Sequence, residues 1–117
     1  MRKFAFVILA MLSMAYAASS CAADTHLSPQ QVLAHPGLYN GKAVSVTGTI
    51  QKFRDRVSHH GNAYETFELC DNNACLHVFA WGNVQRVDGN RDTLSGHFWA
   101  VKHVGSYTFY DELDVGS

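Results

Sequence analysis

Two cysteines separated by four turn-forming residues constrain this chain more than any other feature. They lie in the stretch YETFELCDNNACLHVFAW, where runs of alternating polarity extend from Cys70 back to Tyr64 and from Cys75 on to Trp81. Alternation with a period of two residues is typical of β-strands. The pattern therefore predicts a β-hairpin in which the two cysteines lie opposite each other.

The N-terminus has the features of a signal peptide, and this affects how the cysteines are interpreted. Arg2 and Lys3 precede an apolar run that ends at Leu12, and small residues follow. The apolar run is shorter than the roughly 18–20 residues that a membrane-spanning helix needs. We therefore expect residues 1–23 to be a signal peptide and residues 24–117 to form one domain, periplasmic or secreted.

Two kinds of processing near Cys21 are consistent with the sequence, and both leave Cys70 and Cys75 as a pair. The sequence ASSC resembles a bacterial lipobox, so lipidation of Cys21 and anchoring in the bacterial envelope is an alternative to simple cleavage. Either outcome leaves Cys70 and Cys75 as an even pair, and a disulfide is the usual state of such a pair in an oxidising compartment. A zinc site that includes His77 and a catalytic redox pair are the other interpretations.

Pairing the cysteines also determines which hairpin side chains share a face, because side chains alternate across a β-ribbon. One face is apolar and is expected to pack into the core, with Phe67, Leu69, Leu76 and Val78. The other face is polar and aromatic, with three cross-strand pairs: Tyr64 with Trp81, Thr66 with Phe79, and Glu68 with His77.

A short helix is predicted before the strands. Ser28 suits the N-cap, Pro29 suits the first helical position, and Gln31 completes a capping box. We expect this helix to end at Pro36 and residues 38–41 to form a turn.

The rest of the chain has the alternation of β-structure. Five strands are predicted, over residues 43–53, 64–70, 75–81, 91–104 and 107–113. The segments VSVTGTI and DTLSGHF, in the first and fourth of these strands, have glycine at the same place. Glycine within a strand marks a bulge or bend, which suits a small closed barrel.

Four segments together carry a resemblance to a known family: YNGKAVSVTGTI, SHHGNAYETFELCD, CLHVFAWG and VGSYTFYDEL. They resemble small exported bacterial OB-fold proteins of uncharacterised function, which are related to the nucleic-acid-binding OB-fold group. The resemblance covers residues 36–115. It implies an all-β fold, a five-stranded OB-fold-like Greek-key barrel with a short N-terminal helix.

The resemblance also implies where a ligand binds, since OB-fold proteins commonly use the face of strands two and three and the loops after strands one and four. The implied ligand-binding face is the one selected by the hairpin register: Tyr64, Thr66, Glu68, His77, Phe79 and Trp81. The first loop region is implied to be basic, with Lys52, Arg54, Arg56, His59 and His60. The second loop adds Lys102 and His103. Aromatic rings would stack on bases or sugars, and the cations would hold phosphate or another anion.

The balance of charges and the lack of catalytic motifs limit the functions that the sequence suggests. Without Arg2 and Lys3 the chain has seven basic and ten acidic residues, so indiscriminate nucleic-acid binding is disfavoured. No catalytic motif is present, and no catalytic residue, cofactor or metal site is predicted.

The leading hypothesis is a non-catalytic, monomeric periplasmic module that binds an extended anionic ligand, either an oligonucleotide or a glycan. The alternative is a protein-interaction or envelope-stress module that docks a partner protein. A lesser alternative is a metal-binding domain that uses some of the seven histidines, although none of their spacings matches a defined zinc motif.

Overall fold

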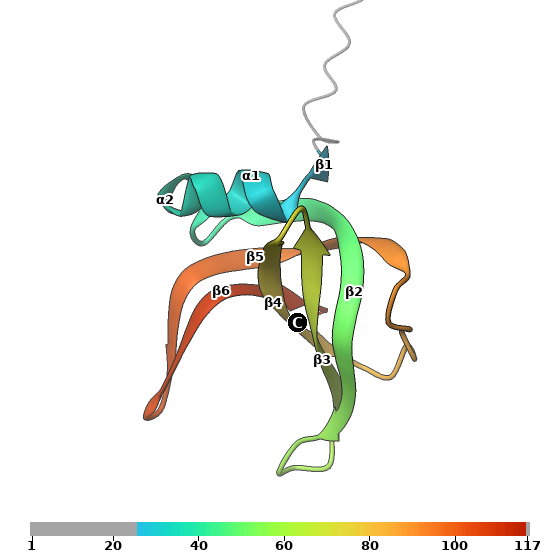
Figure 1. The fold of residues 1–117 in the computed structure, drawn as a ribbon. Coiled ribbons are helices and arrows are strands. Elements are labelled where there is room, and N and C mark those ends of the chain that lie inside the picture. The colour runs from blue at the N-terminus through green and yellow to red at the C-terminus, as the bar shows by residue number, and fades with distance from the viewer. Residues whose placement is uncertain (1–25, 117) are drawn as a thin grey trace, which may run out of the picture.

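The protein is mostly β-structure with two short helices (Figure 1). The computed structural model describes residues 26–116, so the predicted signal peptide and Cys21 lie outside the described part. The elements in chain order are β1 (His26–Leu27), α1 (Pro29–Ala34), α2 (Pro36–Tyr39), β2 (Ala43–Val57), β3 (Ala63–Asp71), β4 (Ala74–Trp81), β5 (Arg91–Val104) and β6 (Tyr107–Val115). Neither helix is long and apolar enough to cross a membrane.

The strands pair in a ring. β2 pairs with β3, β3 with β4, β4 with β6, β6 with β5, and β5 again with β2. The β4–β6 contact is parallel, and the other four are antiparallel. The ring is not a regular barrel, because residues 101–110 of β5 and β6 pair only with each other. We call this projecting hairpin the β5–β6 arm.

Two predictions about the N-terminal part are wrong in detail. The structure has six strands rather than five, because β1 pairs in parallel with Ser45 and Val46 of β2. The turn predicted at residues 38–41 begins instead as the single helical turn α2. The capping box is confirmed: Gln31 N donates to Ser28 Oγ at 3.1 Å, and Ser28 N donates to Gln31 Oε1 at 2.8 Å.

The core fills the inside of the ring and is covered at one end by α1 (Figure 1). It consists of alternate strand side chains and Val32 from the helix. The buried members are Leu27, Val32, Val46, Ile50, Phe67, Leu69, Leu76, Val78, Ala80, Leu94, Phe98 and Leu113. Burial of this apolar surface supplies the main driving force for folding.

The predicted hairpin register is confirmed over its whole length, from Tyr64 opposite Trp81 to Cys70 opposite Cys75. The cysteines form a disulfide, so they offer no thiolates to a zinc ion. The connection is tighter than the predicted four-residue loop. It is a two-residue turn in which Asn72 and Asn73 have φ values of 48° and 71°, as a type I′ turn requires.

The two glycines of the repeated segments allow close approach of neighbouring strands. A Cβ atom at Gly48 would lie 2.9 Å from Leu69 Cγ, and one at Gly96 would overlap the carbonyl oxygen of Asp114. The sequence predicts a bulge or a bend at these glycines, but Gly48 pairs with Asp92 without a register shift, so the bulge is wrong at this position. The register of β2 against β3 shifts between Gln51 and Arg54 instead, several residues after Gly48.

Candidate functional site

A groove of about 640 Å³ lies between the β3–β4 hairpin and the β5–β6 arm. We call it the aromatic groove. The lining residues that matter below are Thr66, His77, Phe79, Trp81, Lys102, Phe109, Tyr110, Glu112 and Asp114. Its volume is within the roughly 300–1,000 Å³ range of small-molecule sites. Four of the six residues predicted for the ligand-binding face line this groove, and Tyr64 and Glu68 lie outside its lining.

Three aromatic side chains of the hairpin form one cluster. The ring of Phe79 stacks on Tyr64 at 4.8 Å between centroids and meets Trp81 edge-on at 5.0 Å. Such contacts contribute about 0.5–1.5 kcal/mol each beyond the area they bury. Tyr64 therefore supports Phe79 from behind, while Trp81 remains 41 % exposed beside the groove.

The β5–β6 arm brings further aromatic side chains to the groove. Phe109 and Tyr110 line it and are both exposed. Both lie in the strand predicted over residues 107–113, but neither was predicted to be a site residue. Their position depends on the folding of the arm across the hairpin, which the local sequence does not reveal.

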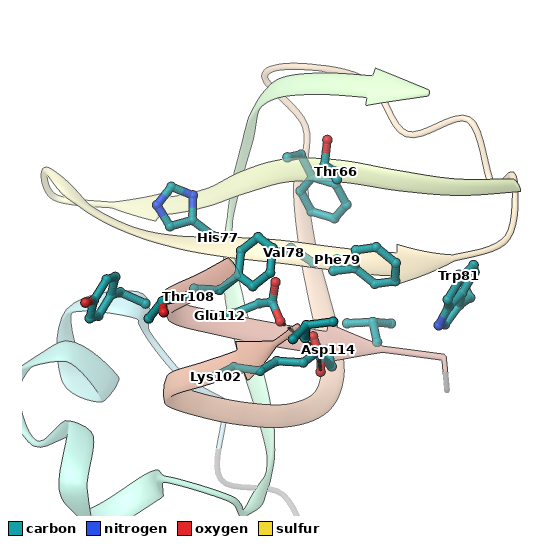
Figure 2. Close-up of a pocket in the computed structure, with 14 residues that line it drawn as sticks. Thr66, His77, Val78, Phe79, Trp81, Lys102, Thr108, Glu112 and Asp114 are labelled. Carbon is teal, nitrogen blue, oxygen red and sulfur yellow. Dashed lines mark hydrogen bonds and ion pairs between the residues drawn. The ribbon is translucent and has the colours of Figure 1, made fainter. Parts of the chain in front are cut away.

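A charged cluster also lines the groove, formed by Lys102, Glu112 and Asp114 (Figure 2). The ammonium Nζ of Lys102 lies 3.1 Å from Glu112 Oε2 and donates to Asp114 Oδ2 at 2.5 Å. The same nitrogen lies 6.0 Å from the centroid of the Phe79 ring. We call these three residues the Lys102 cluster. Its two acids were not predicted as site residues, although their spacing of two places them on one face of a strand.

The Lys102 cluster has perturbed ionisation. The pKa of Glu112 is raised to about 7, mainly by burial and also by the hydrogen bond and charge of Asp114, while the hydrogen bond and charge of Lys102 partly oppose these effects. Burial by itself would lower the pKa of Lys102, but hydrogen bonds to Asp114 and Glu112 and the attraction of both charges raise it overall. The lysine therefore stays charged, and Glu112 changes protonation near neutral pH.

The predicted basic loop is largely a strand. β2 continues to Val57, so Lys52, Arg54 and Arg56 lie on β2, and the turn that follows carries the two histidines. Arg56 Nε donates to Thr66 Oγ1 at 3.3 Å, and Lys52 Nζ lies 3.6 Å from Glu68 Oε2. The basic residues of this region do not line the aromatic groove: Lys52, Arg54, Arg56, His59 and His60.

The second predicted loop is also shorter than expected. Lys102 and His103 belong to β5, and the arm turns at residues 105–106. Lys102 enters the groove, whereas His103 contacts Thr108 across the arm at 3.1 Å. On the hairpin, His77 Nδ1 lies 4.0 Å from Glu68 Oε1, at the limit of an ion pair.

A buried ion pair between Glu65 and Arg86 is structural, and it was not predicted from the sequence. Glu65 is 1 % exposed and accepts hydrogen bonds from Arg86 Nη1 at 2.5 Å and from Gln85 N at 2.8 Å. These bonds hold the connector between β4 and β5 against β3. The sequence does indicate this burial, because Glu65 lies on the same face of the strand as the core residues Phe67 and Leu69.

The histidine-based metal hypothesis gains no support from the described residues. Between residues 26 and 116, one group of three side chains has ligand-type atoms within 4.8 Å of one another, and it consists of Glu68, Cys70 and Cys75. The two sulfur atoms are already bonded to each other.

Comparison of the chain with protein-family models, with curated proteins and with solved structures finds no match. Its function is therefore inferred from the shape, side chains and charge of the groove.

Proposed function

We propose that this chain is a non-catalytic periplasmic binding module of the OB-fold type, and that the aromatic groove binds an extended ligand. The observation that carries the proposal is the position of Trp81 and Phe79 in a groove on the β3–β4 face, with exposed rings of the β5–β6 arm on the other side. Exposed aromatic rings along an open groove favour a ligand with flat faces.

The architecture supports the OB-fold part of the proposal. Five strands form a ring of pairings, and the groove lies on the second and third strands of that ring, where OB-fold proteins commonly bind. The projecting arm replaces a simple loop beside this face.

Two ligand classes have suitable flat faces. Nucleobases stack on aromatic side chains with about 1–3 kcal/mol per base, and sugar rings present an apolar face of C–H groups. Both occur in extended chains that could follow the open groove.

The test compares a groove variant with a matched surface variant by isothermal titration calorimetry. Trp81→Ala removes an exposed ring from the groove, and Tyr107→Ala removes an exposed ring of the arm that does not line it. Chitohexaose, cellohexaose and oligothymidylate serve as probes. We expect Trp81→Ala alone to weaken binding of whichever probe binds the wild type, by about tenfold. Equal affinities of all three proteins would refute the groove as the site.

A second function, docking of a partner protein, is favoured by one specific observation. The β5–β6 arm exposes five large apolar side chains: Val101, Val104, Tyr107, Phe109 and Tyr110. Clustered exposed apolar side chains often mark interaction surfaces. A photo-crosslinking residue at position 107 should then capture a discrete protein in intact cells, and one at position 72, in the hairpin turn, should not. Crosslinking that is absent or equal at both positions would contradict this function.

A further inference from the structure

The charges that line the aromatic groove discriminate between the two ligand classes. Lys102 is the one basic side chain, apart from His77, among the described residues that line it, and two acids accompany it. The lysine already contacts both Glu112 and Asp114. Tight binding of nucleic acid depends on cations that neutralise phosphates. A phosphodiester chain in this groove would meet an engaged ammonium and two acidic groups.

The same cluster has spare hydrogen-bond acceptors. Asp114 Oδ1 is buried and has no hydrogen-bond partner among the described residues, whereas Glu112 Oε2 lies 3.1 Å from the ammonium of Lys102. An ionised carboxylate has about four lone-pair sites and no donor, so one lysine with three N–H groups leaves acceptor capacity unused. Leaving buried acceptors unpaired is unfavourable. A ligand rich in donors, entering beside the 20 % exposed side chain of Asp114, would complete the cluster.

The aromatic side chains fit the other part of such a ligand. Trp81 and Phe109 come from the two elements that border the groove, and each is about two-fifths exposed, at 41 % and 42 %. A sugar ring has apolar C–H faces and hydroxyl groups around its edge. Its C–H faces can stack on the aromatic rings while its hydroxyl groups reach the carboxylates. A sugar would therefore use both the aromatic and the acidic side chains of the groove.

The basic residues that an oligonucleotide would need lie outside the lining of the groove. Lys52, Arg54 and Arg56 are on β2 and do not line the groove. Arg56 donates to Thr66, and Lys52 lies near Glu68. The two ligand classes would therefore depend on different residues, which makes them separable by mutation.

We infer that the aromatic groove binds an uncharged oligosaccharide, with Trp81 and Phe109 stacking on sugar rings and Asp114 accepting hydrogen bonds from sugar hydroxyls. This inference rests on the proposed binding function and narrows its ligand to one class. It replaces the anionic ligand expected from the sequence, since the cations behind that expectation lie outside the groove.

The experiment measures binding of chitohexaose, cellohexaose and oligothymidylate to the full-length, oxidised protein at about 50 and about 500 mM NaCl. We expect at least one hexasaccharide to bind, with an affinity that changes less than about twofold between the two salt concentrations, because no phosphate contacts are involved. Asp114→Asn should weaken this binding by about tenfold, since a neutral amide accepts hydrogen bonds less strongly than a carboxylate. The double variant Arg54→Ala, Arg56→Ala is the control and should bind as the wild type does.

Three outcomes would overturn the inference. They also show whether the proposed binding function fails together with it. Binding of oligothymidylate alone, salt-dependent and lost in the double arginine variant, would refute the glycan while leaving a binding module. Hexasaccharide binding that Trp81→Ala and Asp114→Asn leave unchanged would place the glycan outside the groove. Binding of none of the three probes would refute the glycan and remove the support for the groove as a stacking site. Because the salt dependence is measured on the wild type, it decides the matter even if Asp114→Asn fails to fold.

Discussion

Glu112 is expected to make the stability of this protein depend on pH. Its side chain is 8 % exposed, and burial, together with Asp114, raises its pKa from 4.5 to about 7 in the folded state. Between these two values the folded protein binds more protons at this site than the unfolded chain does. The contribution of Glu112 to the free energy of unfolding is therefore largest below pH 4.5 and is lost as the pH rises through about 7.

The size of this effect follows from the two pKa values. Each pKa unit corresponds to about 1.4 kcal/mol, so the loss amounts to about 3 kcal/mol. This is a large share of the roughly 5–15 kcal/mol that stabilises a small domain. Glu112→Gln removes the ionisable group and keeps a similar shape. The variant should therefore gain about 3 kcal/mol relative to wild type between about pH 5 and about pH 8.

Urea denaturation followed by tryptophan fluorescence measures this difference, with the disulfide intact and the ionic strength constant. Other titrating groups, including the histidines, are common to both proteins and largely cancel in the difference. Asp114→Asn is a useful second variant, because it removes the neighbour that adds to the effect of burial on the pKa of Glu112 and should reduce the pH dependence. A constant difference between wild type and Glu112→Gln over the whole pH range would refute the reasoning.

Three further predictions concern stability. Gly96→Ala should cost about 3 kcal/mol or more, because its Cβ would overlap a backbone oxygen of the adjacent strand; an unchanged melting temperature would contradict this. Arg86→Met should cost about 3–5 kcal/mol in urea denaturation, because it leaves Glu65 buried without its partner, and adding Glu65→Gln should recover part of the loss. Reduction of the Cys70–Cys75 disulfide should lower the free energy of unfolding by about 2 kcal/mol without loss of the β-sheet circular dichroism signal, because the closed loop restricts the unfolded chain. A reduced protein as stable as the oxidised one would contradict this.

The sequence predicts the central hairpin because several local signals agree there. Alternation gives the two faces, and the cysteine pair excludes a shift of one residue, which would move every side chain to the opposite face. The helix start is equally local, since Ser28 and Gln31 bond to each other across three residues. Predictions of this kind need no knowledge of the tertiary structure.

The sequence is less informative where strands are exposed on both faces. The end of β2, from Arg54 to Val57, is exposed throughout and pairs with β3, so no buried side chain produces alternation there. The arm strands are different: their bounds are predicted, since residues 91–104 match β5 and residues 107–113 match most of β6, but the sequence does not indicate that this hairpin projects from the ring. The composition of the groove could not be predicted from the strand pattern alone, since one side of the groove is the arm.

The arm begins where the pairing of β5 with β6 is interrupted, at Ala100 and Asp111. Trp99 and Val101 each pair with β6, but Ala100 between them donates its amide to Asn40 Oδ1 at 2.9 Å. Opposite it, Asp111 has a φ of 52°, a conformation that few residues other than glycine, asparagine and aspartate adopt readily. Beyond this point β5 and β6 bend together away from the ring (Figure 1). Because the arm borders the aromatic groove, this interruption of the ladder lies at the point where one wall of the groove leaves the ring.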